Sequence, residues 1–94
     1  LDYHFTAFIG ILLTKSNRTQ EVLKELTTIP NVIEASVISG KYNIFCKVKA
    51  KNTEDAKRII YQIDDIQDVM RTESMISMQE YLSDKNRLID AVSI

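Results

Sequence analysis

Two stretches rich in β-branched and aromatic side chains, residues 32–38 and 42–48, lie on either side of a short polar segment that contains Gly40. Glycine supplies the positive φ that tight turns between strands need. One alternation face of the second strand carries Ile44, Cys46, Val48 and Ala50, and Phe45 lies on the other face. The pattern predicts a tight β-hairpin whose strands begin at about Val32 and end at about Lys49.

Residues 5–14 and 69–82 have the composition of two further strands, and both carry apolar side chains on each alternation face. In residues 5–14 this pattern is typical of a strand that is buried on both sides. In the first of them, one face carries Phe5, Ala7, Ile9, Ile11 and Leu13, and the other carries Phe8 and Leu12. Gly10, in the middle of this strand, predicts a bulge or a close approach of backbone.

Two segments with apolar residues at helical spacing flank the hairpin. The first follows a polar start, where Asn17 and Gln20 fit a capping box, and Pro30 ends it. Its apolar positions are Val22, Leu23, Leu26 and Ile29. The second begins at Asn52, a capping residue followed by acids that suit the helix dipole. Its apolar positions are Ala56, Ile59, Ile60, Ile63 and Ile66.

This order of elements predicts an α+β, ferredoxin-like βαββαβ domain over residues 1–83, in which a four-stranded antiparallel sheet carries two helices on one face. The other face stays open, with Phe8, Leu12 and Phe45 on it. Apolar surface of this extent usually marks an interface, so we expect a dimer that forms through the sheet. The tail, residues 84–94, has apolar residues at helical spacing. It predicts either a short helix on its own domain or an arm exchanged with a neighbour.

The charge balance, 12 basic against 13 acidic side chains, argues against direct binding to nucleic acid, which calls for a basic excess. Cys46 is the single cysteine, so no internal disulfide can form, and this fits a reducing cytoplasm. No apolar run reaches the roughly 18 residues that a membrane span needs. We therefore expect a cytoplasmic protein without a membrane partner.

Few side chains offer catalytic or metal chemistry. His4 is the sole histidine and lies near the start of the sequence, whereas general acid–base catalysis needs a base held against a partner. Neither a second histidine nor a second cysteine is present to complete a metal site. We expect no enzymatic activity, no metal and no cofactor.

The turn offers a different kind of site. A glycine-containing hairpin exposes backbone N–H groups that can hold a carboxylate, and Tyr42 and Asn43 add a hydroxyl and an amide. Thr72 and Ser74 place two more hydroxyls in phase on the last strand. Together these groups can hold a small zwitterion such as an amino acid. The alternative is an ordinary hairpin with polar neighbours.

Three short patterns follow one another in an order and spacing typical of a known family. They are Pro30-Asn31-Val32 with Glu34-Ala35, the turn Ser39-Gly40-Lys41-Tyr42-Asn43, and Val69-Met70-Arg71-Thr72-Glu73-Ser74. On these patterns, residues 5–81 resemble the effector-binding (RAM) domain of the Lrp/AsnC, or feast/famine, transcription regulators. The resemblance implies a ferredoxin-like domain that dimerises through its sheet and assembles into higher oligomers. It also implies that small effectors, commonly amino acids, bind between dimers near the turn.

Carried over residue by residue, the resemblance assigns effector binding to Ser39, Gly40, Tyr42 and Asn43, with Thr72 and Ser74 as further candidates. The family's usual aspartate at the position of Asn43 can pair with an ammonium group, and an amide lacks that charge. Alternation places Glu73 on the opposite side of its strand from Thr72, away from the expected site.

Full-length members of the family carry a helix-turn-helix domain before this one, and the sequence shows no such domain. The resemblance therefore implies a sensor that acts through its own assembly, or through co-assembly with a full-length regulator. Two alternatives stay open. One is an enzyme of the dimeric α/β-barrel type, which shares this sheet packing, and the other is a purely structural oligomerisation module.

Overall fold

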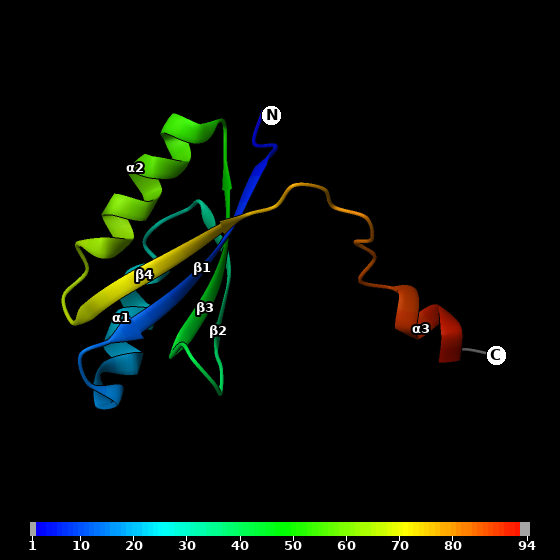
Figure 1. Ribbon diagram of the computed structural model, residues 1–94. Coiled ribbons are helices and arrows are strands. Elements are labelled where there is room, and N and C mark those ends of the chain that lie inside the picture. Colours follow the sequence, from blue (N-terminus) through cyan, green and yellow to red (C-terminus); the bar gives the residue numbers. More distant parts are fainter. Residues whose placement is uncertain (1, 93–94) are drawn as a thin grey trace.

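The computed structural model describes residues 2–92, so residues 1, 93 and 94 of the predicted domain and tail lie outside the described part. Its elements are β1 (Phe5–Leu13), a 3₁₀ turn (Ser16–Arg18), α1 (Thr19–Leu26), β2 (Val32–Val37), β3 (Ile44–Ala50), α2 (Thr53–Asp64), β4 (Val69–Ile76) and α3 (Arg87–Val92). The strands pair antiparallel in the order β2-β3-β1-β4. Helices α1 and α2 lie on one side of this sheet (Figure 1). The predicted ferredoxin-like βαββαβ fold is confirmed.

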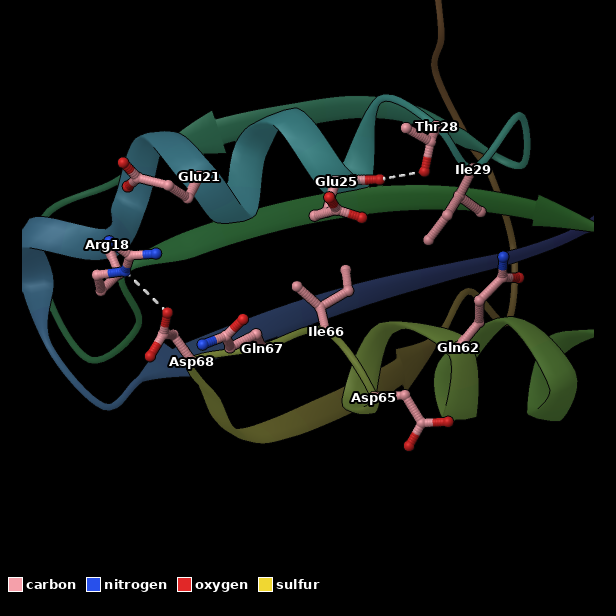
Figure 2. Close-up of a pocket in the computed structure, with 10 residues that line it drawn as sticks. All are labelled: Arg18, Glu21, Glu25, Thr28, Ile29, Gln62, Asp65, Ile66, Gln67 and Asp68. Atoms are coloured by element: carbon pink, nitrogen blue, oxygen red, sulfur yellow. Dashed lines mark hydrogen bonds and ion pairs between the residues drawn. The ribbon is translucent and has the colours of Figure 1, made fainter.

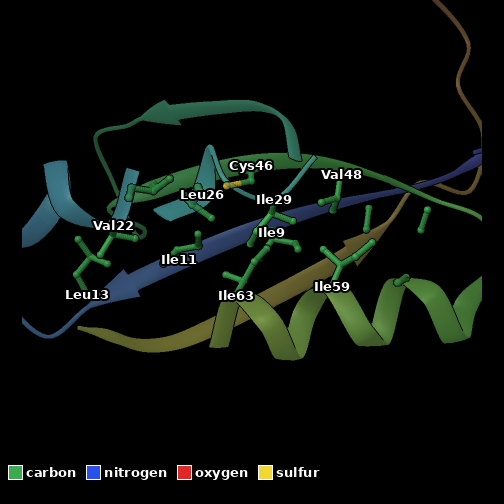
Figure 3. Close-up of a cluster of buried hydrophobic side chains, with 14 residues drawn as sticks. Ile9, Ile11, Leu13, Val22, Leu26, Ile29, Cys46, Val48, Ile59 and Ile63 are labelled. Carbon is green, nitrogen blue, oxygen red and sulfur yellow. The ribbon is translucent and has the colours of Figure 1, made fainter. Parts of the chain in front are cut away.

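Alternation along the two central strands builds the core beneath the helices. The buried face of β3 consists of the four residues that the pattern predicted, Ile44, Cys46, Val48 and Ala50. The buried face of β1 adds Ala7, Ile9, Ile11 and Leu13, and the helices cover both strands with Val22, Leu26, Ile59 and Ile63 (Figure 3). Burial of these side chains fixes which face of each strand meets the helices, and therefore which face stays open.

The two long helices begin differently. At α2, Asn52 Oδ1 accepts a hydrogen bond from the backbone N–H of Asp55 at 2.9 Å, which confirms the predicted cap. The capping box predicted at Asn17 and Gln20 is wrong, because residues 16–18 form a 3₁₀ turn and no side chain caps α1. Within residues 2–92, no helix is long and apolar enough to cross a bilayer.

Helix α1 ends at Leu26, earlier than the stop that was predicted at Pro30. The hydroxyls of Thr27 and Thr28 each donate, at 2.6 Å, to a carbonyl of the last helical turn. Such side-chain bonds compete with continuation of the helix. Ile29 is nevertheless buried in the core, and it reaches the core from the loop rather than from the helix.

Strand β4 ends at Ile76 rather than continuing to residue 82. Ile76 pairs with Ala7, and β1 begins at Phe5, so almost no part of β1 is left for a longer β4 to pair with. One further backbone bond, from Ser77 N to Thr6 O at 2.9 Å, closes the pairing. The chain then leaves the sheet and leads to α3, which stands apart from the rest of the domain (Figure 1).

Candidate functional site

The β2–β3 turn is closed by a hydrogen bond from Ile38 N to Asn43 O at 3.2 Å. Gly40 adopts φ +113°, in the left-handed region that favours glycine, so it has the role in the turn that the sequence predicted. Ser39 and Gly40 lie exposed at the tip of the loop. The turn therefore presents backbone to solvent at one end of the sheet.

The ring of Tyr42 folds back from this turn and lies on Gly10 of β1. A Cβ at Gly10 would stand 2.6 Å from three ring carbons of Tyr42, which is closer than side chains pack. The close approach predicted at this glycine therefore exists, but an aromatic ring makes it rather than backbone. The predicted bulge lies elsewhere, between Leu12 and Leu13.

Tyr42 also reaches across β1 to β4, where its hydroxyl donates a hydrogen bond to the carboxylate of Glu73. Two cations complete what we call the Tyr42 cluster: Lys41 Nζ lies 3.3 Å from Glu73 Oε1, and Arg71 Nη2 lies 3.5 Å from Glu73 Oε2. The hydrogen bond from Tyr42 and the adjacent cations lower the pKa of Glu73. The same hydrogen bond raises the pKa of Tyr42. At neutral pH the carboxylate is therefore charged and the phenol protonated.

Asn43 is bound into the end of the sheet. Its backbone N–H donates to Ile11 O at 2.9 Å, and its side-chain Oδ1 accepts from Leu13 N at 2.9 Å. The pairing of β1 with β3 ends at Ile11 and Ile44, so the amide oxygen satisfies a donor of β1 beyond the end of that pairing. In this arrangement Asn43 fastens the turn to β1.

The hydroxyls predicted on β4 lie on the other side of the sheet from the Tyr42 cluster. Thr72 pairs with Ile11 and Ser74 with Ile9, and both isoleucines face the helices. Thr72 Oγ1 donates to Asp64 Oδ1 of α2 at 2.6 Å. The structure therefore does not bring Thr72 and Ser74 together with the turn.

The sequence correctly predicted that Glu73 and Thr72 lie on opposite sides of β4. It predicted the turn on the side of Thr72, but the turn lies on the side of Glu73. Glu73 pairs with Gly10, and Gly10 pairs with Phe45 on β3, so these three positions form one row across the open face. The register between strands, rather than alternation within a strand, decides which side the turn meets. For the same reason, the sequence did not predict that Lys41 and Arg71 lie against Glu73 in the Tyr42 cluster.

Half-buried aromatic side chains continue the open face beside the Tyr42 cluster. The rings of Phe8 and Phe45 stack with centroids 6.0 Å apart, and the Tyr42 and Phe45 centroids lie 6.3 Å apart. Leu12 is also half-buried here, and Met75, opposite Phe8, is 40% exposed. The residues predicted as a dimer interface therefore share one surface with the Tyr42 cluster.

A polar cleft lies on the opposite side of the molecule, between α1 and the loop that follows α2 (Figure 2). Its volume is about 530 Å³, and its lining includes Glu21, Glu25 and Asp65. At one end, Arg18 Nε donates to Asp68 Oδ2 at 2.8 Å, and this bond raises the pKa of Arg18. The ion pair ties the start of α1 to the start of β4, which gives this end of the cleft a structural role.

His4 is exposed, and the described residues 2–92 contain no group of three or more histidine, cysteine or acidic side chains that could hold a metal ion. Cys46 is buried among apolar side chains, and burial raises the pKa of its thiol to about 11. The thiol is therefore protonated and shielded. The Tyr42 cluster, by contrast, brings a carboxylate, a phenol and two cations together on the open face of the sheet.

Residues 6–87 match the family described as the Lrp/AsnC ligand binding domain. The chain belongs to the Lrp/AsnC family. The regulatory protein AsnC of Haemophilus influenzae is 34% identical over 80 residues, which are 84% of this chain and 53% of that protein. This Lrp/AsnC chain thus spans about half the length of the curated relatives it matches.

Two solved structures show how closely the fold is shared. The structure of E. coli AsnC has a TM-score of 0.85 at 27% identity, and the match covers 88% of this chain and 56% of that one. A feast or famine regulatory protein from M. tuberculosis, complexed with L-methionine, has a TM-score of 0.79 at 19% identity. That match covers 89% of this chain and 56% of the M. tuberculosis chain and shows the common fold.

Proposed function

We propose that this chain is an effector-sensing regulatory domain that binds an amino acid at the Tyr42 cluster and converts binding into a change of assembly. The observation that carries the proposal is the cluster itself, in which a carboxylate, a phenol and two cations meet beside the turn. Membership of a ligand-binding family supports a small-molecule effector. The L-methionine bound by the M. tuberculosis protein supports the amino-acid class.

The charges of the cluster suit the two ends of a zwitterion. The side chains of Lys41 and Arg71 are 65% and 60% exposed, and surface ion pairs of this kind contribute little to stability. Both cations can therefore turn towards the carboxylate of an effector at small cost, while Glu73 accepts its ammonium group. On this account Glu73 supplies the negative charge that Asn43 lacks. Ser39 and Gly40, at the tip of the turn, contribute backbone groups.

Coupling to assembly follows from where the cluster lies. In one chain it is open to solvent, on the same face as the aromatic pair Phe8 and Phe45. A second copy that packs its sheet against this face would close the cluster. A ligand that binds only the closed site stabilises the assembly that forms it. Larger oligomers, or mixed assemblies with a full-length Lrp/AsnC regulator, would respond in the same way.

The relatives are regulators, which favours a role without catalysis and a location in the cytoplasm. The nearly balanced charge of the chain favours small-molecule and protein partners over direct contact with nucleic acid. No feature of the described residues favours the α/β-barrel enzyme over this function.

Titration calorimetry with a panel of the common amino acids tests the proposal. We expect at least one to bind, and we expect Glu73→Gln to weaken that binding by roughly tenfold or more, because it removes the charge that faces the ammonium group. Thr72→Ala is the matched control, since Thr72 adjoins Glu73 in sequence but lies on the helix side of the sheet. Failure of every amino acid to bind would contradict the proposal. So would weaker binding by Thr72→Ala with no effect of Glu73→Gln.

A further inference from the structure

A pocket lies beside the start of β2, which is an edge strand of the sheet. Its volume is about 560 Å³, and small-molecule sites typically measure roughly 300–1,000 Å³. The described residues that line it are Tyr3, Pro30, Asn31, Ile33 and Lys49. Three of these five side chains are apolar or aromatic, one is an amide and one is a cation. The pocket, which we call the Lys49 pocket, therefore joins an apolar wall to a single positive charge.

The Lys49 pocket is separate from the Tyr42 cluster. Lys49 pairs with Thr6 of β1, whereas the ring of Tyr42 lies on Gly10 of the same strand. Phe8 stands between these two positions on the same alternation face. The pocket and the cluster have no lining residue in common. A ligand in one can therefore be distinguished from a ligand in the other.

The backbone of the pocket is held by the sheet, while its apolar side chains are left uncovered. Asn31 is tied to β3 twice, because its Nδ2 donates to Lys49 O at 2.9 Å and its carbonyl accepts from Lys49 N at 2.9 Å. An irregularity in the pairing of β2 with β3 leaves Ile33 without a partner residue, and Ile33 is 49% exposed. Lys51 Nζ lies 5.5 Å from the centre of the Tyr3 ring, within cation–π range. The site is thus built before a ligand arrives.

Lys49 brings to this pocket a half-buried ammonium group that lacks a carboxylate partner. Its Nζ donates to Thr6 Oγ1 at 2.7 Å, and Thr6 is itself buried. The other cations of the open face, Lys41, Lys47 and Arg71, each contact a carboxylate. Among residues 2–92, Lys49 forms no such ion pair. Because an ammonium group has three donors and a partly buried charge is stabilised by a counter-charge, this position suits an anion.

We infer that the Lys49 pocket binds a small apolar monocarboxylate, with the carboxylate on Lys49 and the hydrocarbon body against Ile33 and Tyr3. None of the described residues that line the pocket is acidic. An amino acid would therefore leave its ammonium group without a counter-charge here, whereas Glu73 offers one in the Tyr42 cluster. The pocket thus selects a carboxylic acid over the amino acid with the same side chain. This site goes beyond the proposed function and does not depend on it.

An NMR titration followed at the amides of Asn31, Ile33 and Lys49 tests the chemistry of the ligand. Three compounds share one skeleton: 3-phenylpropionate, L-phenylalanine, which adds an ammonium group, and 3-phenyl-1-propanol, which replaces the carboxylate by a hydroxyl. At these amides we expect the acid to bind roughly tenfold or more tightly than either relative, the scale of one hydrogen bond to a charged group. Failure of 3-phenylpropionate to shift these amides would overturn the inference, and so would equal binding of the alcohol.

Point variants test the part played by the lysine. We expect Lys49→Met, which removes the charge and keeps an unbranched side chain, to weaken binding of 3-phenylpropionate by roughly tenfold or more. Lys49→Arg keeps the charge and should retain most of the binding. Lys47→Met is the matched control, because Lys47 is a half-buried lysine on the same face of β3 but does not line the pocket. Equal weakening by Lys47→Met and Lys49→Met would overturn the inference.

The same titration keeps this site apart from the effector site. We expect Glu73→Gln to leave the binding of 3-phenylpropionate unchanged, since Glu73 belongs to the Tyr42 cluster. Loss of 3-phenylpropionate binding in Glu73→Gln would contradict a separate site. Amino-acid binding at the Tyr42 cluster can therefore fail while the Lys49 pocket holds, and the reverse is equally possible.

Discussion

The ring of Tyr42 occupies the space in which a side chain at Gly10 would stand. Gly10→Ala would set a methyl group 2.6 Å from three ring carbons, so the ring must move away. Because overpacking of this kind is destabilising, we expect a loss of about 1–3 kcal/mol in the free energy of unfolding. Urea denaturation measures it. In a Tyr42→Ala background the cost should largely disappear, and an equal cost in both backgrounds would show that the ring is not what excludes the methyl group.

Asn43 can be tested by the acceptor that it provides. Asn43→Ala leaves the N–H of Leu13 without its partner, and we expect a loss of about 1–3 kcal/mol in stability. Asn43→Asp keeps an oxygen within reach of the same N–H and should cost clearly less. Urea denaturation of both variants gives the comparison. If alanine and aspartate were equally destabilising, the hydrogen bond to Leu13 would not be the role of Asn43.

The hydrogen bond between Tyr42 and Glu73 makes stability depend on pH in both directions. Folding lowers the pKa of Glu73. The ionised carboxylate therefore stabilises the folded chain above the ordinary carboxyl pKa, and this stabilisation is lost as pH falls through the lowered pKa of the folded state. Folding raises the pKa of Tyr42. The protonated phenol therefore stabilises the folded chain below the ordinary phenol pKa of about 10, and this stabilisation is lost as pH rises through the raised pKa of the folded state.

We therefore expect Glu73→Gln to bring the pKa of Tyr42 back towards that of an exposed tyrosine. An NMR titration of the Tyr42 ring carbons measures the shift, and Tyr61, on the helix side, serves as an internal control. An unchanged Tyr42 titration in the variant would mean that Glu73 does not hold its proton.

Cys46 offers a test of the core. Burial raises the pKa of its thiol to about 11, and the thiolate is the reactive form. At pH 8 we expect a thiol reagent to modify the folded chain roughly 100-fold more slowly than the urea-unfolded chain. The raised pKa also means that stability falls as pH climbs towards 11, because the unfolded thiol ionises first. Equally fast modification of both forms would contradict the burial of this residue.

Much of the fold follows from the spacing of apolar residues. The alternation in residues 44–50 predicted the buried face of β3, and Asn52 predicted the start of α2, because each depends on neighbours in sequence. The early end of α1 and the short β4 were not predictable in this way. The first depends on threonine side chains after Leu26, and the second depends on where the partner strand begins.

The site was predictable only in part. Gly40, Tyr42 and Asn43 could be singled out because a turn is local. The contact of Tyr42 with Gly10 and Glu73 could not, since it depends on the register of β1 with both of its neighbours. A one-position change in that register would have placed Thr72 beside the turn instead.

The measurement that tests the central claim most directly is the sedimentation of the chain with and without the amino acid that calorimetry identifies. The account predicts that saturating ligand tightens self-association of the wild type by about tenfold, a typical coupling between sites, and leaves that of Glu73→Gln nearly unchanged. Ligand that binds while the sedimentation of the wild type stays the same would contradict the claim that the Tyr42 cluster couples an effector to assembly.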